Sequence, residues 1–132
     1  MAVLLIVEDT PANMKLADIL LTRAGHTVLH AVNAEAGLLL AATERPDLIL
    51  MDIQLPGMDG LTATTLLKKD PVTAAIPIIA LTALATKSDR ERSERAGCDG
   101  YISKPLRYQE LYSTIDSLLH PDLPFSNEDA PA

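Results

Sequence analysis

Three acidic residues, Glu8, Asp9 and Asp52, each follow an apolar segment of the sequence. Glu8 and Asp9 come after VLLIV, and Asp52 comes after DLILM and precedes a Pro-Gly turn. Carboxylate oxygens are ligands that Mg²⁺ prefers, usually one or two of them together with a phosphate. A carboxylate can also act as a nucleophile and form an acyl phosphate. If the fold gathers these acids, we expect Asp9 and Asp52 to bind Mg²⁺ directly and Asp52 to accept a phosphoryl group.

Three further residues could hold a phosphoryl group beside Asp52. Thr82 could donate a hydrogen bond to it, the small side chain of Ala83 would leave room for it, and the ammonium of Lys104 could pair with its charge. Each residue alone also has an ordinary structural interpretation, such as a turn former for Asp52 or a solvated charge for Lys104. The chemistry therefore depends on whether the fold brings these residues to one place.

Apolar runs of strand length alternate with helix signals along the sequence. We expect strands at residues 3–7, 26–31, 47–51, 76–81 and 99–103. We expect helices at residues 11–24, 34–43, 60–69, 87–96 and 107–119. Five strand–helix units result.

Capping residues mark the ends of several of these helices. Thr10 before a proline and Asn33 are expected N-caps, and Thr86 with an acidic residue three positions later resembles a capping box. Gly25 and Gly97 are expected to end the first and fourth helices, since glycine adopts the left-handed conformation found after a helix.

Strands that are apolar almost throughout, separated by helices, imply a parallel sheet covered on both faces and joined by right-handed crossovers. The predicted fold is a flavodoxin-like, doubly wound α/β fold with an open (βα)5 sheet, because five units are too few for the usual eight-stranded barrel. The strand order 2-1-3-4-5 is common in such sheets, which bind ligands at the carboxyl ends of their strands. This order would cluster Glu8, Asp9 and Asp52 beside Thr82 and Lys104.

The length and composition favour one small globular domain. The chain has 132 residues, of which 48% are apolar, and a formal net charge of −7, which argues against nucleic acid or an anionic membrane as partner. The single cysteine, Cys98, is interpreted as a packed side chain, and no apolar run is long enough to span a membrane. We expect a cytoplasmic protein with a folded domain at residues 1–119 and a disordered acidic tail at residues 120–132.

Four sequence motifs together resemble the receiver domain of two-component response regulators. They are LIVED at 5–9, PDLILMDIQLPGMDG at 46–60, IIALTA at 78–83 and YISKP at 101–105. Within that family, NMKL, MDIQLP and the GC and YISKP of GCDGYISKP resemble motifs of single-domain cell-cycle regulators of the DivK kind. The resemblance extends to about residue 119.

The resemblance implies that Asp52 is phosphorylated by a sensor histidine kinase or a phosphotransfer protein. It implies that Mg²⁺ is held by Asp9, Asp52 and the backbone carbonyl of Gln54. Glu8 matches an acidic position that binds the metal, often through water. The domain would not be an enzyme in the usual sense, although it would assist its own phosphoryl transfer and dephosphorylation.

The resemblance also implies a conformational switch. Thr82 would move toward the phosphoryl group and the ring of Tyr101 would swing into the vacated space, while Lys104-Pro105 matches a motif with a cis peptide. The switched surface would comprise the fourth helix, the fifth strand and the fifth helix. It would contact a downstream protein, with the domain as a monomer or as a phosphorylation-dependent homodimer. Candidate contact residues are Arg90, Glu91, Glu94, Tyr101, Tyr108 and Tyr112.

Two other functions share parts of this pattern. A phosphohydrolase of the haloacid dehalogenase type also uses an aspartate nucleophile, Mg²⁺, a hydroxyl and a lysine, but it needs a second acid at the position of Gln54. A flavin-binding module would need a hydroxyl-rich phosphate loop after the first strand, where Glu8 and Asp9 would instead repel the flavin phosphate. Turnover of a phosphate ester would identify the first, and a yellow purified protein the second.

Overall fold

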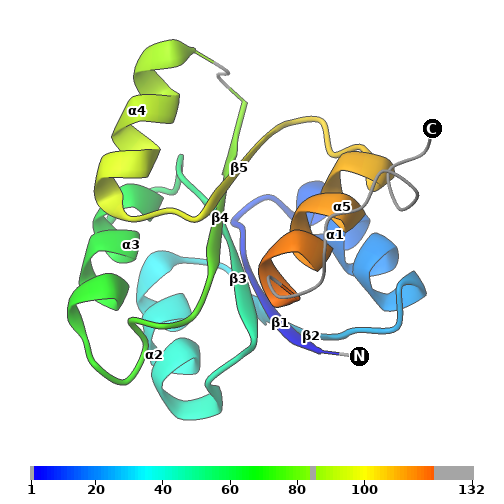
Figure 1. The fold of residues 1–132 in the computed structure, drawn as a ribbon, viewed down its shortest axis with the longest axis horizontal. Helices are drawn as coiled ribbons and strands as arrows, with labels where there is room; N and C mark the ends of the chain where they lie inside the picture. Colours follow the sequence, from blue (N-terminus) through cyan, green and yellow to red (C-terminus); the bar gives the residue numbers. More distant parts are fainter. Residues whose placement is uncertain (1, 84–85, 121–132) are drawn as a thin grey trace.

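The computed structural model describes residues 2–83 and 86–120, which form five strands alternating with five helices (Figure 1). The strands are β1 (Val3–Val7), β2 (Thr27–Ala31), β3 (Leu48–Asp52), β4 (Ile78–Thr82) and β5 (Gly100–Ser103). The helices are α1 (Pro11–Arg23), α2 (Ala34–Glu44), α3 (Gly60–Lys69), α4 (Lys87–Ala96) and α5 (Tyr108–Leu119). The predicted acidic tail lies, apart from His120, outside the described residues.

All five strands are parallel and lie in the order β2-β1-β3-β4-β5, which confirms the predicted fold. The register places Val7 of β1 beside Met51 of β3, and Thr82 of β4 beside Ser103 of β5. Because the strands are parallel and closely in register, the residues that follow them emerge at the same edge of the sheet.

The helices cover both faces of the sheet, with α1 and α5 on one face and α2, α3 and α4 on the other (Figure 1). Side chains along a strand point alternately to the two faces. In β1, Leu4 and Ile6 pack in the cluster with α1 and α5, whereas Leu5 and Val7 pack in the cluster with α2 and α3. Burial on both faces explains why the strands are apolar throughout rather than alternating.

Most of the predicted helix ends are confirmed. The side chain of Asn33 accepts a hydrogen bond from the Ala36 N–H at 2.8 Å, and Thr86 accepts one from Asp89 at 3.0 Å. Gly97 follows α4 with a φ of 106°. The bonds at these helix ends join residues that lie three or four positions apart in the sequence.

The predicted cap at Thr10 is wrong in one respect. Thr10 occupies the N-cap position before Pro11, but its side chain makes no capping hydrogen bond. Its backbone N–H instead donates to a carboxylate oxygen of Glu8 at 3.1 Å. The carboxylate of Glu8 therefore helps to hold the turn from β1 into α1.

The fourth strand begins later than predicted, at Ile78 rather than Ile76. The Ile76 N–H closes a turn onto the carbonyl of Thr73 at 3.0 Å, and Pro77 has no N–H to donate to a neighbouring strand. The strand also extends one residue further and includes Thr82.

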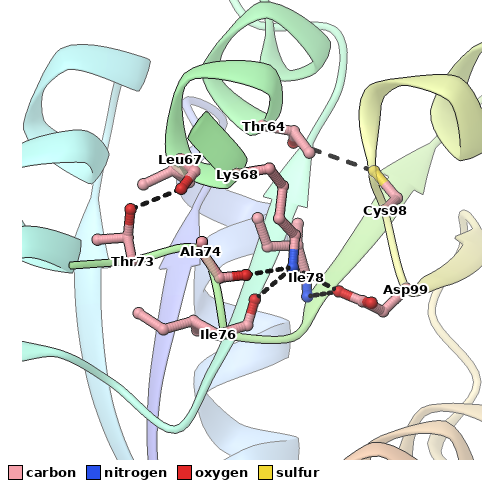
Figure 2. A network of polar contacts seen from close by, with 9 residues as sticks. All are labelled: Thr64, Leu67, Lys68, Thr73, Ala74, Ile76, Ile78, Cys98 and Asp99. Atoms are coloured by element: carbon pink, nitrogen blue, oxygen red, sulfur yellow. Dashed lines mark hydrogen bonds and ion pairs between the residues drawn. The ribbon is translucent and has the colours of Figure 1, made fainter. Parts of the chain in front are cut away.

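One ammonium group joins three segments at the edge where β4 and β5 begin (Figure 2). Lys68 of α3 donates to the carbonyls of Ala74 and Ile76 at 3.3 and 2.8 Å, and to the carboxylate of Asp99 at 2.9 Å. The same oxygen of Asp99 accepts the N–H of Ile78 at 2.9 Å. This network ties the end of α3 to the starts of both strands, away from their carboxyl ends.

Cys98 lies beside this network, with its sulfur 4.0 Å from the hydroxyl oxygen of Thr64 (Figure 2). Burial raises the pKa of the Cys98 thiol to about 11. The thiolate is the reactive form, so this cysteine is a packed side chain with little reactivity at neutral pH. Within residues 2–83 and 86–120, no helix is long and apolar enough to cross a lipid bilayer.

Candidate functional site

The carboxyl ends of the strands bring the three predicted acids together. Glu8 and Asp52 are buried, with 2% and 3% of their surface exposed, whereas Asp9 is exposed. One carboxylate oxygen from each lies within 4.8 Å of those of the other two. The clustering that the strand order predicted is therefore present in the fold.

Lys104 joins two of these acids. Its ammonium nitrogen lies 2.8 Å from Oε1 of Glu8 and 2.9 Å from Oδ2 of Asp52. Its backbone N–H donates to the carbonyl of Thr82 at 2.7 Å, and the peptide bond between Lys104 and Pro105 is cis. The loop after β5 thus holds a single cation between two buried anions.

The second oxygen of each buried carboxylate also has a protein partner. Oε2 of Glu8 accepts from the Thr10 N–H, and Oδ1 of Asp52 accepts from the Gln54 N–H at 2.9 Å. Both carboxylates are therefore held at two points. The carboxylate of Asp52 is oriented between a lysine on one oxygen and a backbone amide on the other.

Burial and charge act in opposite directions on the titration of this cluster. Burial raises the pKa of Glu8, and its hydrogen bond to Lys104 opposes that rise. Burial lowers the pKa of Lys104, but the hydrogen bonds and charges of Glu8 and Asp52 outweigh it, so the pKa of Lys104 is raised overall. Lys104 therefore remains a cation near neutral pH.

The donor set of the cluster suits a hard divalent cation. Three carboxylates and one ammonium leave a net charge of −2 when all four groups are ionised. All the side-chain ligands are oxygens, which is the chemistry that Mg²⁺ selects. Gln54 is the second residue after the end of β3, and its N–H bond to Asp52 places its backbone beside the cluster.

The predicted phosphate-binding and switch residues lie at the neighbouring strand ends. Thr82 ends β4 and is fully buried, Ala83 follows it and is exposed, and Tyr101 is half-buried on β5. Burial raises the pKa of Tyr101, whereas a hydrogen bond with Thr82 and the charge of Arg90 lower it. The two predicted switch residues lie on adjacent strands, close enough for Thr82 to influence the titration of Tyr101.

The contact between Arg90 and Tyr101 was not predicted from the sequence. The guanidinium carbon of Arg90 lies 5.6 Å from the centre of the Tyr101 ring, within the range of a cation–π interaction. Both residues were expected on the switched surface, but no local pattern links a residue of α4 to one of β5. Only the packing of the helix against the strand brings them together.

Comparison with known proteins identifies the family of this chain. The response regulator receiver domain model matches residues 4–116. The chain belongs to the response regulator receiver domain family. It is 47% identical over 115 residues to the polar-differentiation response regulator DivK of Brucella anthropi, covering 87% of this chain and 94% of DivK. It is 41% identical over 119 residues to protein PilH of Pseudomonas aeruginosa, covering 90% and 98%.

Solved structures of receiver domains share the same fold. A receiver domain of a sensor histidine kinase from Pseudomonas aeruginosa, with a magnesium ion coordinated in its active-site cleft, matches with a TM-score of 0.84 and 34% identity over 89% of this chain and 97% of that one. A CheY-like receiver domain protein from Methanospirillum hungatei matches with a TM-score of 0.84 and 30% identity over 92% and 95%.

The family assignment decides between the functions suggested by the sequence. This chain is a receiver domain of two-component signalling, and the phosphohydrolase alternative finds no support. The receiver family is not in general a family of enzymes. In this receiver the position that a haloacid dehalogenase fills with a second acid holds Gln54, whose backbone N–H orients Asp52.

Proposed function

We propose that Asp52 is the residue of this receiver domain that accepts a phosphoryl group from a sensor histidine kinase or a phosphotransfer protein. The observation that carries the proposal is the meeting of three acids and Lys104 at the carboxyl edge of the sheet. Asp52 is buried in this cluster and oriented at both oxygens. An oriented carboxylate can attack phosphorus in line with the departing group.

The same cluster is the proposed binding site for Mg²⁺. Asp9, Asp52 and the backbone carbonyl of Gln54 would hold the ion, and Glu8 would contact it through water. When bound, the metal would neutralise charge that develops on the transferring phosphoryl group.

Three residues are proposed to hold the phosphoryl group on Asp52. Lys104 would exchange its bond with the Asp52 carboxylate for one with a phosphoryl oxygen, since a phosphoryl group carries more negative charge. The hydroxyl of Thr82 would donate to a second oxygen. The small side chain of Ala83, which is exposed, would leave the approach to Asp52 open.

The conformational response is proposed to pass through Thr82 and Tyr101. Movement of the Thr82 hydroxyl toward the phosphoryl group would end its interaction with Tyr101 and release that ring from its present position. Because Arg90 packs on the same ring, α4 would respond together with β5. The surface of α4, β5 and α5 would then bind a downstream protein in the cytoplasm, with the receiver domain of residues 1–119 as a monomer or a phosphorylation-dependent homodimer.

Intact-mass spectrometry after incubation with acetyl phosphate tests this proposal. We expect wild-type protein to gain one phosphoryl group only when Mg²⁺ is present, and Asp52→Asn to gain none. Asp70→Asn is a matched control, because it removes an acid at the far end of α3, and it should behave as wild type. Modification of Asp52→Asn would contradict the assignment of Asp52, and modification of wild type in the absence of any divalent cation would contradict the proposed role of Mg²⁺.

A further inference from the structure

We propose that Gly60 is a positioning residue that orients the carboxylate of Asp52 through a single peptide plane. Gly60 is the first residue of α3, and it packs against the end of β3. This inference rests on the proposed role of Asp52 as phosphoacceptor. Gly60 has no side chain, and its backbone would align Oδ1 of Asp52.

The backbone of α3 approaches the backbone of β3 too closely for any side chain at position 60. An ideal Cβ atom there would overlap the carbonyl oxygen of Asp52. It would also lie 2.7 Å from Cα of Ile53 and 2.8 Å from the carbonyl carbon of Asp52. These are backbone atoms, which cannot rotate away as the end of a side chain can. Any other residue would force α3 and the end of β3 apart.

This close approach allows a hydrogen bond that bears on Asp52. The N–H of Gly60 donates to the carbonyl of Ile53 at 3.3 Å. The N–H of Gln54 belongs to the same peptide unit as that carbonyl, and it donates to Oδ1 of Asp52 at 2.9 Å. Because a peptide unit is planar, holding its carbonyl sets the direction of its N–H. Gly60 therefore bonds to the carbonyl of the same peptide unit whose N–H bonds to the carboxylate of Asp52.

Other bonds keep both sides of this contact in place. Asp59 caps α3 by accepting from the Thr62 N–H at 2.8 Å, and the buried hydroxyl of Thr64 donates to the Gly60 carbonyl at 2.8 Å. The Ile53 N–H donates to the carbonyl of Leu81 in β4 at 3.0 Å. The start of α3 and the end of β3 are thus each fixed, and Gly60 connects them.

Replacing Gly60 by alanine should break this connection. The bond from Gly60 to Ile53 is already long, so a further separation of a few tenths of an ångström exceeds hydrogen-bond distance. The peptide between Ile53 and Gln54 could then turn, and Oδ1 of Asp52 would lose its aligned donor. Loss of such supporting contacts around a metal or reactive group typically costs about 10-fold to 100-fold in affinity or activity.

The test compares initial rates of phosphorylation by acetyl phosphate at saturating Mg²⁺ for wild type, Gly60→Ala and Gly100→Ala. Gly100 is a matched control, because an added Cβ would also be crowded there, 3.2 Å from side-chain atoms of Ile79 and Thr114. Gly100 is the first residue of β5, so it lies at the amino ends of the strands, away from Asp52. Thermal melts would confirm that each variant is folded at the assay temperature. We expect Gly60→Ala to react about tenfold more slowly or worse, and Gly100→Ala to react as wild type.

A spectroscopic measurement separates positioning from general destabilisation. The amide proton of Gln54 is bonded to a carboxylate, so its resonance should lie downfield in wild type and in Gly100→Ala. It should move upfield in Gly60→Ala. A Gln54 resonance and a reaction rate that are both unchanged in Gly60→Ala would overturn the inference.

A second pair of variants decides the question if Gly60→Ala does not fold. Asp59→Ala and Asp59→Ser both remove the same charge, but serine retains the ability to cap α3. If the start of α3 positions Asp52, Asp59→Ala should be phosphorylated more slowly than Asp59→Ser. Equal rates for the two variants would overturn the inference.

The outcome for wild type distinguishes this inference from the proposed function. If wild type gains no phosphoryl group, the assignment of Asp52 fails and the role of Gly60 fails with it. If wild type is phosphorylated at Asp52 and Gly60→Ala reacts at the same rate, only the role of Gly60 is refuted.

Discussion

Replacing Lys104 by methionine should strongly destabilise the metal-free domain. Methionine has about the same length and is apolar, so the main change is loss of the charge. Lys104 is 18% exposed, and its two partners, Glu8 and Asp52, are almost completely buried. Without the ammonium, two buried carboxylates would remain side by side with no cation between them.

The magnitude can be worked from the distances. At 2.8 and 2.9 Å and an effective dielectric constant of about 20, each pair has an attraction of about 6 kcal/mol. Oxygens of Glu8 and Asp52 within 4.8 Å of each other repel by at least about 3 kcal/mol on the same scale. Water entry and proton uptake by Glu8, whose pKa burial already raises, limit the loss. We therefore expect a net loss of about 3–5 kcal/mol, as is typical when one partner of a buried ion pair is removed.

Urea unfolding followed by circular dichroism measures this loss. Wild type and Lys104→Met would be compared near neutral pH in a chelating buffer, with Lys69→Met as a control at an exposed lysine of α3. We expect the control to change the free energy of unfolding by less than about 0.5 kcal/mol. Adding Glu8→Gln to Lys104→Met should recover part of the loss, because it removes one of the two unpaired charges.

Two results would refute this reasoning. A loss below about 1 kcal/mol would show that water solvates the cluster well enough to make the ion pairs weak, as at an exposed surface. A double variant no more stable than Lys104→Met would show that the loss comes from packing of the lysine stem rather than from unpaired charge.

Three further measurements test other parts of the structure. Lys68→Met should lower the free energy of unfolding by about 2 kcal/mol relative to Lys69→Met, because it removes the donor to the carbonyls of Ala74 and Ile76 and the cation beside Asp99. Cys98 should react with a thiol reagent at about pH 8 far more slowly than in urea, since a pKa of about 11 leaves roughly one thiol in a thousand ionised. Burial lowers the pKa of His26, whose Nδ1 accepts the Ala2 N–H at 3.2 Å. The folded protein therefore favours neutral His26, so this residue contributes stability above the ordinary histidine pKa of 6.5, and the contribution is lost as the pH falls. Its proton resonances should titrate below 6.5, and lowering the pH from about 7.5 to 5.5 should destabilise wild type more than His26→Gln.

Where sequence prediction succeeded, the signals were local. A continuous apolar run such as LLIV predicts a buried strand because both of its faces must be covered. The cap at Asn33 and the helix end at Gly97 depend on backbone atoms within four residues. The start of β4 was misplaced because Ile76 looks like strand in composition, whereas Pro77 withholds the N–H that pairing requires.

The candidate site was predicted in outline by the same local signals combined with one rule of topology. Parallel strands end at one edge, so acids that follow strands converge once the strand order is known. The partners of the individual oxygens could not be predicted in this way. That Glu8 accepts the Thr10 N–H and that the Thr10 side chain makes no cap bond depend on the geometry of the turn between β1 and α1, which residue types alone do not specify.

The sequence by itself determined the alternation of strands and helices, the fold class and the residue types that the sheet edge would carry, because each follows from hydrophobic periodicity and capping within a short stretch of chain. Only the tertiary structure decided how those residues meet. The bridge from Lys104 to two acids, the packing of Arg90 on Tyr101 and the approach of Gly60 to the backbone of Asp52 join segments that are far apart or separated by a turn. Such contacts depend on how strands and helices pack, which no local pattern records.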